Sequence, residues 1–196
     1  MLLIAALLLL LYNRRESDRA GEAAEEAAQL LTEIISVTPS SEPIGKEAAQ
    51  AAETPEKSHS TEENIRNIDG YDYIGVLQIP VLELELGVMS RFDYDRLSVA
   101  PCRQTGSAVT DDMVIVAHNF DRHFGKLKTL QVGDSIVFTD VDGVENAYSV
   151  ARMETVEPTD VEYVLQSGYP LVLYTCTYGG KSRVTVFCER IAEAEK

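Results

Sequence analysis

The chain has 196 residues, of which 32 are acidic and 17 are basic, and its formal net charge at pH 7 is −15. This length predicts one compact domain with additional segments. The acidic balance argues against nucleic acid or an anionic membrane surface as a partner, because either would favour clustered lysine and arginine. The three cysteines, an odd number, do not describe a framework of disulfides.

The N-terminal residues 1–11 are apolar without interruption and are followed by Tyr-Asn-Arg-Arg at 12–15. A helix needs about 20 apolar residues to span the hydrocarbon core. We therefore interpret residues 1–12 as part of a membrane anchor that starts upstream of Met1. A signal-peptide core is the alternative, but no small-residue cleavage site follows it. Arg14 and Arg15 oppose an extracellular domain, because basic residues mark the cytoplasmic side of a span.

Residues 13–68 predict a helix followed by a linker. Apolar residues recur at three- and four-residue steps in 16–37, which is typical of an amphipathic helix. We interpret this helix as a solvated stalk, with packing on the folded domain as the alternative. Residues 43–67 are polar with almost no large apolar side chain, which predicts a flexible linker. Removing residues 1–67 should then leave a folded domain at 69–196.

Short strands dominate the chain from residue 69 onward. Alternating or continuous apolar runs predict strands at 74–79, 82–88, 113–117, 135–140, 147–156, 171–176 and 183–190. In the second of these, strict alternation places Leu82, Leu84 and Leu86 inward. Residues 92–110 are less regular and predict a turn of helix and a loop. About seven or eight strands with few helices favour a mainly β fold, a closed or nearly closed mixed barrel.

The strands at 171–176 and 183–190 frame the best candidate for a nucleophile. Cys176 ends the first strand, Arg183 opens the second, and a Gly-Gly turn lies between them. A strand end next to a loop holds a nucleophile in place and leaves it accessible. A nearby cation favours the reactive thiolate, and the planar fork of an arginine can also bind an oxyanion. The alternative for Cys176 is a buried structural thiol.

Three histidines are available as the acid–base group. His118 directly follows the apolar run 113–117, so, like Cys176, it stands at a strand end and is the best candidate. His59 lies in a polar stretch of low complexity. His123 lies in a loop-like sequence and is predicted to be a surface or rim residue.

The other two cysteines lack a cationic partner of this kind. Cys102 is predicted to be a loop thiol and Cys188 a packing residue on the last strand, with a disulfide between them as the alternative outside the cell. No cluster has the spacing of metal ligands, and the acidic pairs at 111–112 and at 140 and 142 predict turns. Neither a metal nor another cofactor is predicted.

Three short motifs resemble the sortases, the cysteine transpeptidases of Gram-positive bacterial surfaces. Leu-Tyr-Thr-Cys at 173–176 is similar to their Thr-Leu-x-Thr-Cys signature. Val-Ala-His-Asn at 116–119 resembles the segment that contains their histidine. Arg-Val-Thr-Val at 183–186 resembles the segment that supplies their arginine.

Two further motifs extend the resemblance over residues 71–189, in the order that the family has. Residues 73–80 are similar to the first strand of sortases, and Gly-Asp-Ser-Ile-Val-Phe at 133–138 resembles a middle strand with its preceding turn. One residue departs from the pattern: Val172 stands where the signature most often has threonine. A β-branched apolar residue suits a buried strand.

The resemblance implies an eight-stranded sortase-like barrel and a division of roles. Cys176 would attack a backbone carbonyl in a sorting-signal peptide of the Leu-Pro-x-Thr type, Arg183 would stabilise the oxyanion, and His118 would exchange protons with the leaving and entering amines. Thr175 and Asn119 are candidates for positioning the substrate. The alternative for Thr175 is that it is an ordinary strand residue. The alternative for Asn119 is that it orients His118.

The resemblance also implies partners and a location. The amine acceptor would be a cell-wall precursor or a pilin lysine, and the chain would be anchored in the cell membrane by a single span with its catalytic domain outside. Two other functions remain open: a secreted cysteine peptidase, and a catalytically silent binding domain tethered to the membrane. A papain-type peptidase is disfavoured, because His118 precedes Cys176 in this chain.

Overall fold

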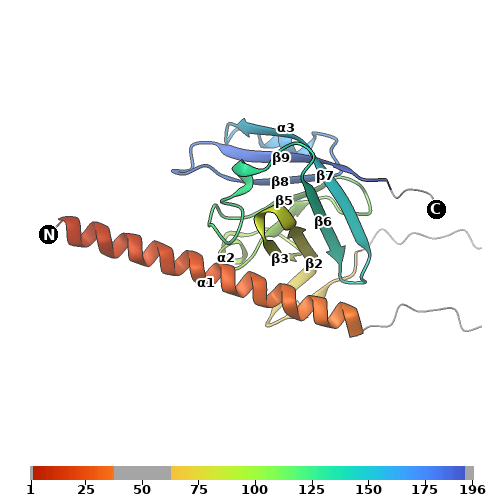
Figure 1. Cartoon of the computed structure of the whole chain (residues 1–196), viewed down its shortest axis with the longest axis horizontal. Coiled ribbons are helices and arrows are strands. Elements are labelled where there is room, and N and C mark those ends of the chain that lie inside the picture. Colours follow the sequence, from red (N-terminus) through yellow and green to blue (C-terminus); the bar gives the residue numbers. More distant parts are fainter. Residues whose placement is uncertain (1, 38–62, 193–196) are drawn as a thin grey trace, which may run out of the picture.

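A computed structural model describes residues 2–37 and 63–192 of the chain (Figure 1). His59 and most of the predicted linker, residues 43–67, lie outside the described residues. The described part consists of a β-barrel and one long helix, whose second half packs against the barrel (Figure 1).

The strands form one sheet that closes on itself. They are β1 (Arg66–Ile68), β2 (Tyr71–Ile79), β3 (Leu84–Met89), β4 (Cys102–Thr105), β5 (Met113–Val116), β6 (Ser135–Asp140), β7 (Glu145–Val156), β8 (Leu171–Cys176) and β9 (Arg183–Arg190). Neighbours follow the order β1-β2-β3-β4-β5-β8-β9-β7-β6, and β2 also pairs with β6. This pairing closes β2 to β9 into a barrel and leaves β1 as a hairpin partner of β2. The predicted eight-stranded barrel is confirmed.

The barrel is mixed, and its helices are short. The pairs β3–β4 and β5–β8 are parallel, whereas the other pairs are antiparallel. The short helices are η1 (Pro80–Leu82), α2 (Tyr94–Leu97), η2 (Leu127–Thr129) and α3 (Val161–Leu165). Parallel neighbours need a crossover, and in β5–β8 this brings residues distant in the sequence side by side.

Most predicted strands are present with similar bounds, and the turn of helix predicted within 92–110 is α2, but the predicted loop contains a strand. Leu82, Leu84 and Leu86 are buried as expected. Residues 92–110 contain α2 and also β4, a strand that the sequence did not indicate. Cys102 begins β4 and is fully buried, so the prediction of a loop thiol is wrong.

The long helix α1 (Leu2–Val37) packs on the barrel instead of forming a solvated stalk. One face of its second half is buried, and its fully buried residues include Ala24, Ala28 and Leu31. These side chains belong to the same apolar cluster as the barrel interior. The stalk interpretation is therefore wrong, and its alternative, packing on the folded domain, is correct.

Small residues on both sides allow this close packing. A Cβ atom added to Gly87 of β3 would lie 3.1 Å from the Tyr73 ring and 3.2 Å from the Ala27 Cβ of α1. An alanine-rich helix face thus fits against a strand that presents glycine at the contact. The sequence shows the apolar spacing of α1. It does not show that α1 packs against Gly87 of β3, where a side chain as small as alanine fills the contact.

The first part of α1 extends beyond the barrel (Figure 1). Ile4, Leu7, Leu8, Leu9 and Leu11 are each more than half exposed there. Within the part of the chain that the structure describes, no helix is both long and apolar enough to cross a membrane.

Candidate active site

Three neighbouring strands bring His118, Cys176 and Arg183 together at one end of the barrel. In the antiparallel pair β8–β9, Cys176 lies directly opposite Arg183. In the parallel pair β5–β8, Val116 lies beside Tyr174. The pairing continues one residue further, because the Ala117 N–H donates to the Tyr174 carbonyl (3.3 Å).

His118 directly follows Ala117, so the same register, continued to this residue beyond the end of β5, places His118 next to Cys176. Neighbouring strands lie about 4.8 Å apart, and residues directly opposite one another project from the same face of a sheet. His118, Cys176 and Arg183 therefore form one row across three strands, with the thiol in the middle.

Cys176 is the accessible thiol of the three cysteines. It is half-buried and free, whereas Cys102 and Cys188 are fully buried and also free. Burial raises the pKa of both Cys102 and Cys188 to about 12. The alternative of a disulfide between these two residues is thus wrong, and Cys188 is the packing residue that the sequence predicted. Only Cys176 combines access with a neighbouring cation.

His118 is half-buried at the end of β5. Burial lowers its pKa below the ordinary value, so the imidazole is neutral over a wider range of pH. A neutral ring can accept the proton of the neighbouring thiol. Its plane stacks on Phe120, with ring centroids 4.8 Å apart and planes inclined by 30°. This contact limits the orientations that the imidazole can adopt.

Arg183 keeps part of its donor set open. Its Nη1 donates to the carbonyls of Gly180 (3.1 Å) and Ser182 (3.0 Å) in the β8–β9 loop. Among the described residues, its Nε and Nη2 groups have no hydrogen-bond partner. The loop thus holds Nη1 of the guanidinium, and Nε and Nη2 remain available to an anion.

Thr175 and Asn119, the two candidates for positioning the substrate, differ in their surroundings. Thr175 is buried, and its Oγ1 donates to the carbonyl of Ala117 (2.8 Å). It therefore ties β8 to the residue before His118 and does not face an open site. Asn119 is half-buried at the edge of a second opening, between α1 and the loop after His118. No hydrogen bond joins the side chains of Asn119 and His118, both of which the structure describes.

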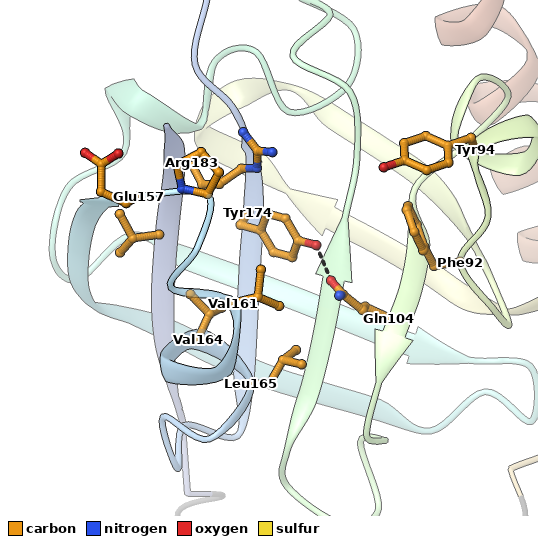
Figure 2. A pocket seen from close by; sticks show the side chains of 11 residues that line it. Phe92, Tyr94, Gln104, Glu157, Val161, Val164, Leu165, Tyr174 and Arg183 are labelled. Carbon is orange, nitrogen blue, oxygen red and sulfur yellow. Dashed lines mark hydrogen bonds between the residues drawn. The ribbon is translucent and has the colours of Figure 1, made fainter. Parts of the chain in front are cut away.

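A pocket of about 270 Å³ opens beside Arg183 and Tyr174 (Figure 2). Apolar side chains of α3 form one wall, and residues between β3 and β5 form the other. Tyr174 donates a hydrogen bond across it to Gln104. The lining consists of Phe92, Tyr94, Gln104, Val156, Glu157, Pro158, Val161, Val164, Leu165, Tyr174 and Arg183.

Most of these lining residues were missed in the sequence. The short helix α3 was not predicted, although Val161, Val164 and Leu165 have the three- and four-residue spacing of one helix face. Gln104 belongs to β4, in a segment where the sequence predicts a loop. This spacing of apolar residues indicates a helix. Over a single turn, however, the same pattern also occurs by chance in segments that are not helical.

His123 is not the surface or rim residue that the sequence suggested. It is fully buried, and its Nε2 lies 3.1 Å from the carbonyl oxygen of Ala20 in α1. The loop that contains it is covered by α1, which explains the error.

The acidic pairs form turns in the structure. Asp112 accepts hydrogen bonds from the Ser107 N–H and the Thr110 hydroxyl, and Asp140 accepts from the N–H groups of Asp142 and Val144. Within residues 2–37 and 63–192, no group of three or more His, Cys, Asp or Glu side chains is arranged to hold a metal ion.

Comparison with known proteins adds a family and a set of similar folds. The family model for the Sortase domain matches residues 77–191. A search of curated proteins finds no significant match. Solved structures with a similar fold include sortase C1 from Streptococcus agalactiae, a sortase D5 transpeptidase from Clostridium perfringens, and sortase C1 of GBS Pilus Island 1.

The three likenesses agree in the fold. Sortase C1 from Streptococcus agalactiae is 22% identical, with a TM-score of 0.56 over 65% of this chain and 72% of that chain. The Clostridium perfringens protein is 23% identical, with a TM-score of 0.56 over 66% of this chain and 84% of that one. Sortase C1 of GBS Pilus Island 1 is 21% identical, with a TM-score of 0.55 over 93% of this chain and 86% of that one.

Proposed function

The chain belongs to the sortase family of cysteine transpeptidases, and we propose that it cleaves a sorting-signal peptide of the Leu-Pro-x-Thr type and joins the new carboxyl end to an amine. The observation that supports this proposal most directly is the row of His118, Cys176 and Arg183 on adjacent strand ends. A binding domain without catalysis has no need of a thiol, an imidazole and a guanidinium in one row.

In the first step, the Sγ of Cys176 attacks the scissile carbonyl, and the C–N bond of the peptide breaks. His118 takes the thiol proton and delivers it to the leaving amine. The side of the Arg183 guanidinium that faces away from the loop carbonyls binds the oxyanion of the tetrahedral intermediate. A thioacyl intermediate on Cys176 results.

In the second step, an amine attacks the thioester, and the C–S bond breaks. His118 removes the proton of the entering amine and returns a proton to the Cys176 sulfur. Amide formation restores the free thiol, so the enzyme needs no oxidant and no cofactor for the cycle.

The pocket beside Arg183 is the proposed site for the apolar residues of the sorting signal. It lies on the same sheet face as Cys176, because Tyr174 and Cys176 are two residues apart on β8. Val161, Val164 and Leu165 supply an apolar wall for leucine and proline (Figure 2). Tyr174 and Gln104 supply polar atoms for the peptide backbone.

The acceptor is proposed to be a primary amine of a cell-wall precursor or of a pilin lysine. The similar sortase C1 of GBS Pilus Island 1 supports the second source. In either case His118 is the group that deprotonates the amine.

The membrane anchor is proposed to lie at residues 1–12, with the catalytic domain outside the cell. Exposed leucine and isoleucine side chains at the start of α1 support this proposal. Sortases act at the cell surface, where their substrates and acceptors lie.

The decisive experiment incubates the purified chain with a Leu-Pro-x-Thr-Gly peptide, with and without triglycine, and follows products by mass spectrometry. A transpeptidase forms the triglycine adduct, and Cys176→Ala abolishes it. Hydrolysis that triglycine leaves unchanged would support the secreted peptidase instead. The absence of any cleavage, with a peptide that still binds, would support the silent binding domain. Cys188→Ala is the matched control, because it removes a thiol outside the row and should keep most activity.

A further inference from the structure

The segment that bears His118 is a compact turn, residues 118–125, which we call the His118 turn. Its backbone closes on itself, because the Phe124 N–H donates to the His118 carbonyl (3.1 Å) and the Gly125 N–H donates to the Phe120 carbonyl (2.9 Å). The Phe120 ring stacks on His118 and also contacts the His123 ring, with centroids 5.8 Å apart. A displacement of His123 therefore moves the ring on which His118 rests.

The first contact between α1 and this turn is the buried His123. Its Nε2 lies 3.1 Å from the Ala20 carbonyl, which can only accept a hydrogen bond, so Nε2 is the donor. Its Nδ1 is buried and has no hydrogen-bond partner among the described residues, which fits the neutral ring with a single proton on Nε2. Burial lowers the pKa of His123 to about 4, against the opposing effects of the hydrogen bond to Ala20 and of Glu25, while His118 and Arg122 lower it further.

The second contact is an ion pair at the surface. The Arg122 Nε donates to the Glu25 carboxylate (3.0 Å), Nη2 pairs with the same carboxylate, and Nη1 lies 3.7 Å from Glu22. A fork-to-carboxylate pair fixes an angle as well as a distance. It therefore constrains the direction in which the turn faces α1.

The third contact is a close approach of backbone and side chain. A Cβ atom added to Gly21 would lie 2.5 Å from the Arg122 Cβ and 2.8 Å from its Cδ. Only glycine allows α1 to come this near to the turn. All three contacts fall within residues 20–25 of α1, whereas Ala27 and Leu31 further along contact the barrel.

We propose that α1 contributes to the catalytic site: residues 20–25 hold the His118 turn through His123, Arg122 and Gly21, and thereby fix His118 opposite Cys176. His123 and Arg122 are positioning residues in this proposal, since neither contacts the reacting atoms. The inference rests on the proposed catalytic role of His118. Misplacement of a catalytic group by about 1 Å costs on the order of a hundredfold in rate, so a loosened turn should lower kcat.

The test uses the full chain and three variants, assayed well below their melting temperatures. His123→Leu keeps the bulk and loses the Nε2 donor, and His123→Gln keeps an N–H donor. Leu31→Ala is the matched control, because it weakens the packing of α1 at a distance from the turn. We expect His123→Leu to lower kcat by about ten- to a hundredfold with KM within about twofold, and His123→Gln to restore most of the rate. Leu31→Ala should lower Tm and keep kcat.

A second readout separates positioning from stability. The NMR titration of the His118 imidazole should differ between His123→Leu and the unmodified chain, and should be unchanged in Leu31→Ala. If His123→Leu has unchanged kcat and an unchanged His118 titration, the proposal is overturned, whatever its Tm. If His123→Leu does not fold, Arg122→Gln decides instead: its ion pair is half-exposed, so the variant should fold, and kcat should fall several-fold. Unchanged kcat in that variant overturns the proposal.

His118→Ala distinguishes this inference from the proposed function. Turnover that persists in His118→Ala contradicts the catalytic role of His118 and with it both proposals. An inactive His118→Ala together with a fully active His123→Leu leaves the proposed function in place and overturns the positioning role alone.

Discussion

Arg183 stands directly across the β8–β9 pair from Cys176, and two roles are open to a cation at that position. It can favour the thiolate by its charge, or it can bind the oxyanion through its planar set of donors. The structure leaves Nε and Nη2 without partners among the described residues, on the side away from the loop carbonyls. This geometry favours the oxyanion role.

The two roles differ in their response to lysine. If Arg183 binds the oxyanion, Arg183→Lys should lose about as much kcat as Arg183→Ala, on the order of a hundredfold, because a point charge does not replace the fork. If it acts only on the thiol pKa, lysine should restore much of the rate, and a higher pH should restore Arg183→Ala. The pH–rate profiles of both variants measure this. Lys181→Ala, an exposed change in the same loop, should alter kcat by less than about threefold.

The three thiols should differ sharply in reactivity. Burial raises the pKa of Cys102 and Cys188 to about 12, and neither side chain is exposed. We therefore expect iodoacetamide to modify only Cys176 in the folded chain, and all three cysteines in denaturant. Peptide mapping by mass spectrometry measures the sites. Modification of Cys188 at a rate similar to that of Cys176 under native conditions would contradict the buried placement of this strand.

Arg152 holds α3 against the outer face of the sheet. Its guanidinium lies 4.3 Å from the centre of the Phe187 ring and 5.9 Å from that of Tyr163. Its Nη2 donates to the Tyr163 hydroxyl (2.9 Å), which in turn donates to Glu154 (3.0 Å). Because Tyr163 belongs to α3, this contact fixes a wall of the pocket beside Arg183.

Loss of this contact should affect binding more than chemistry. We expect Arg152→Ala to raise KM for the sorting-signal peptide several-fold with little change in kcat, because α3 does not touch the reacting atoms. Tyr163→Phe is the matched control: it keeps the ring and loses only the hydroxyl, so its KM should rise less. Steady-state kinetics with a fluorogenic peptide measures both. An unchanged KM in Arg152→Ala would show that α3 is held by its apolar contacts alone.

The placement of α1 changes what truncation should do. The sequence suggested that residues 1–67 can be removed without loss, but Ala24, Ala28 and Leu31 are fully buried against the barrel. Removal of residues 1–18 should leave Tm nearly unchanged, because the buried face begins at Ala20. Removal of residues 1–37 should lower the free energy of unfolding by more than Leu31→Ala alone, which is expected to cost about 2–5 kcal/mol. Thermal unfolding, followed by circular dichroism, gives the melting temperatures of the two truncated chains. Equal melting temperatures of the chain without residues 1–18 and the chain without residues 1–37 would contradict the observed packing.

The strands that could be predicted are those with their own apolar pattern. β8 and β9 have the predicted bounds, because their runs are long and their turn contains two glycines. β4 was missed because Cys-Arg-Gln-Thr has no apolar pattern and is held by its neighbours, β3 and β5. The sequence does not indicate the burial of His123 for a similar reason. This burial depends on α1, whose Ala20 lies 103 positions away in the sequence.

The candidate site is a product of the barrel topology. Thr175 and Ala117 are separated by 58 positions in the sequence, yet the Thr175 hydroxyl donates to the Ala117 carbonyl. Spacing alone does not indicate that the strands before His118 and Cys176 are parallel neighbours. The sequence placed both residues at strand ends, and the parallel β5–β8 pairing shows that these two strands are neighbours.

Closure of the barrel depends on one close approach between β2 and β6. Gly75 lies opposite Asp140 in this pairing, and a Cβ atom at Gly75 would lie 2.2 Å from the Thr139 carbonyl oxygen. The obstructing atom belongs to the backbone, so a side-chain rotation does not relieve the contact. The strands would have to separate where the sheet closes.

Gly75→Ala should therefore destabilise the whole barrel. Overpacking in a close-packed site costs about 1–3 kcal/mol, and a backbone obstruction belongs at the upper end, which corresponds to a fall in Tm on the order of 10 °C. Gly133→Ala is the matched control, because Gly133 has a φ of +95° but nothing within 4 Å of an added Cβ, so only a left-handed backbone penalty of about 1–2 kcal/mol applies. Thermal unfolding gives the two melting temperatures, and hydrogen exchange should show faster opening at β2 and β6 in Gly75→Ala alone. Equal stability of the two variants would mean that the backbone obstruction at Gly75 adds no cost beyond that of an ordinary left-handed position, and would contradict this account of the closure.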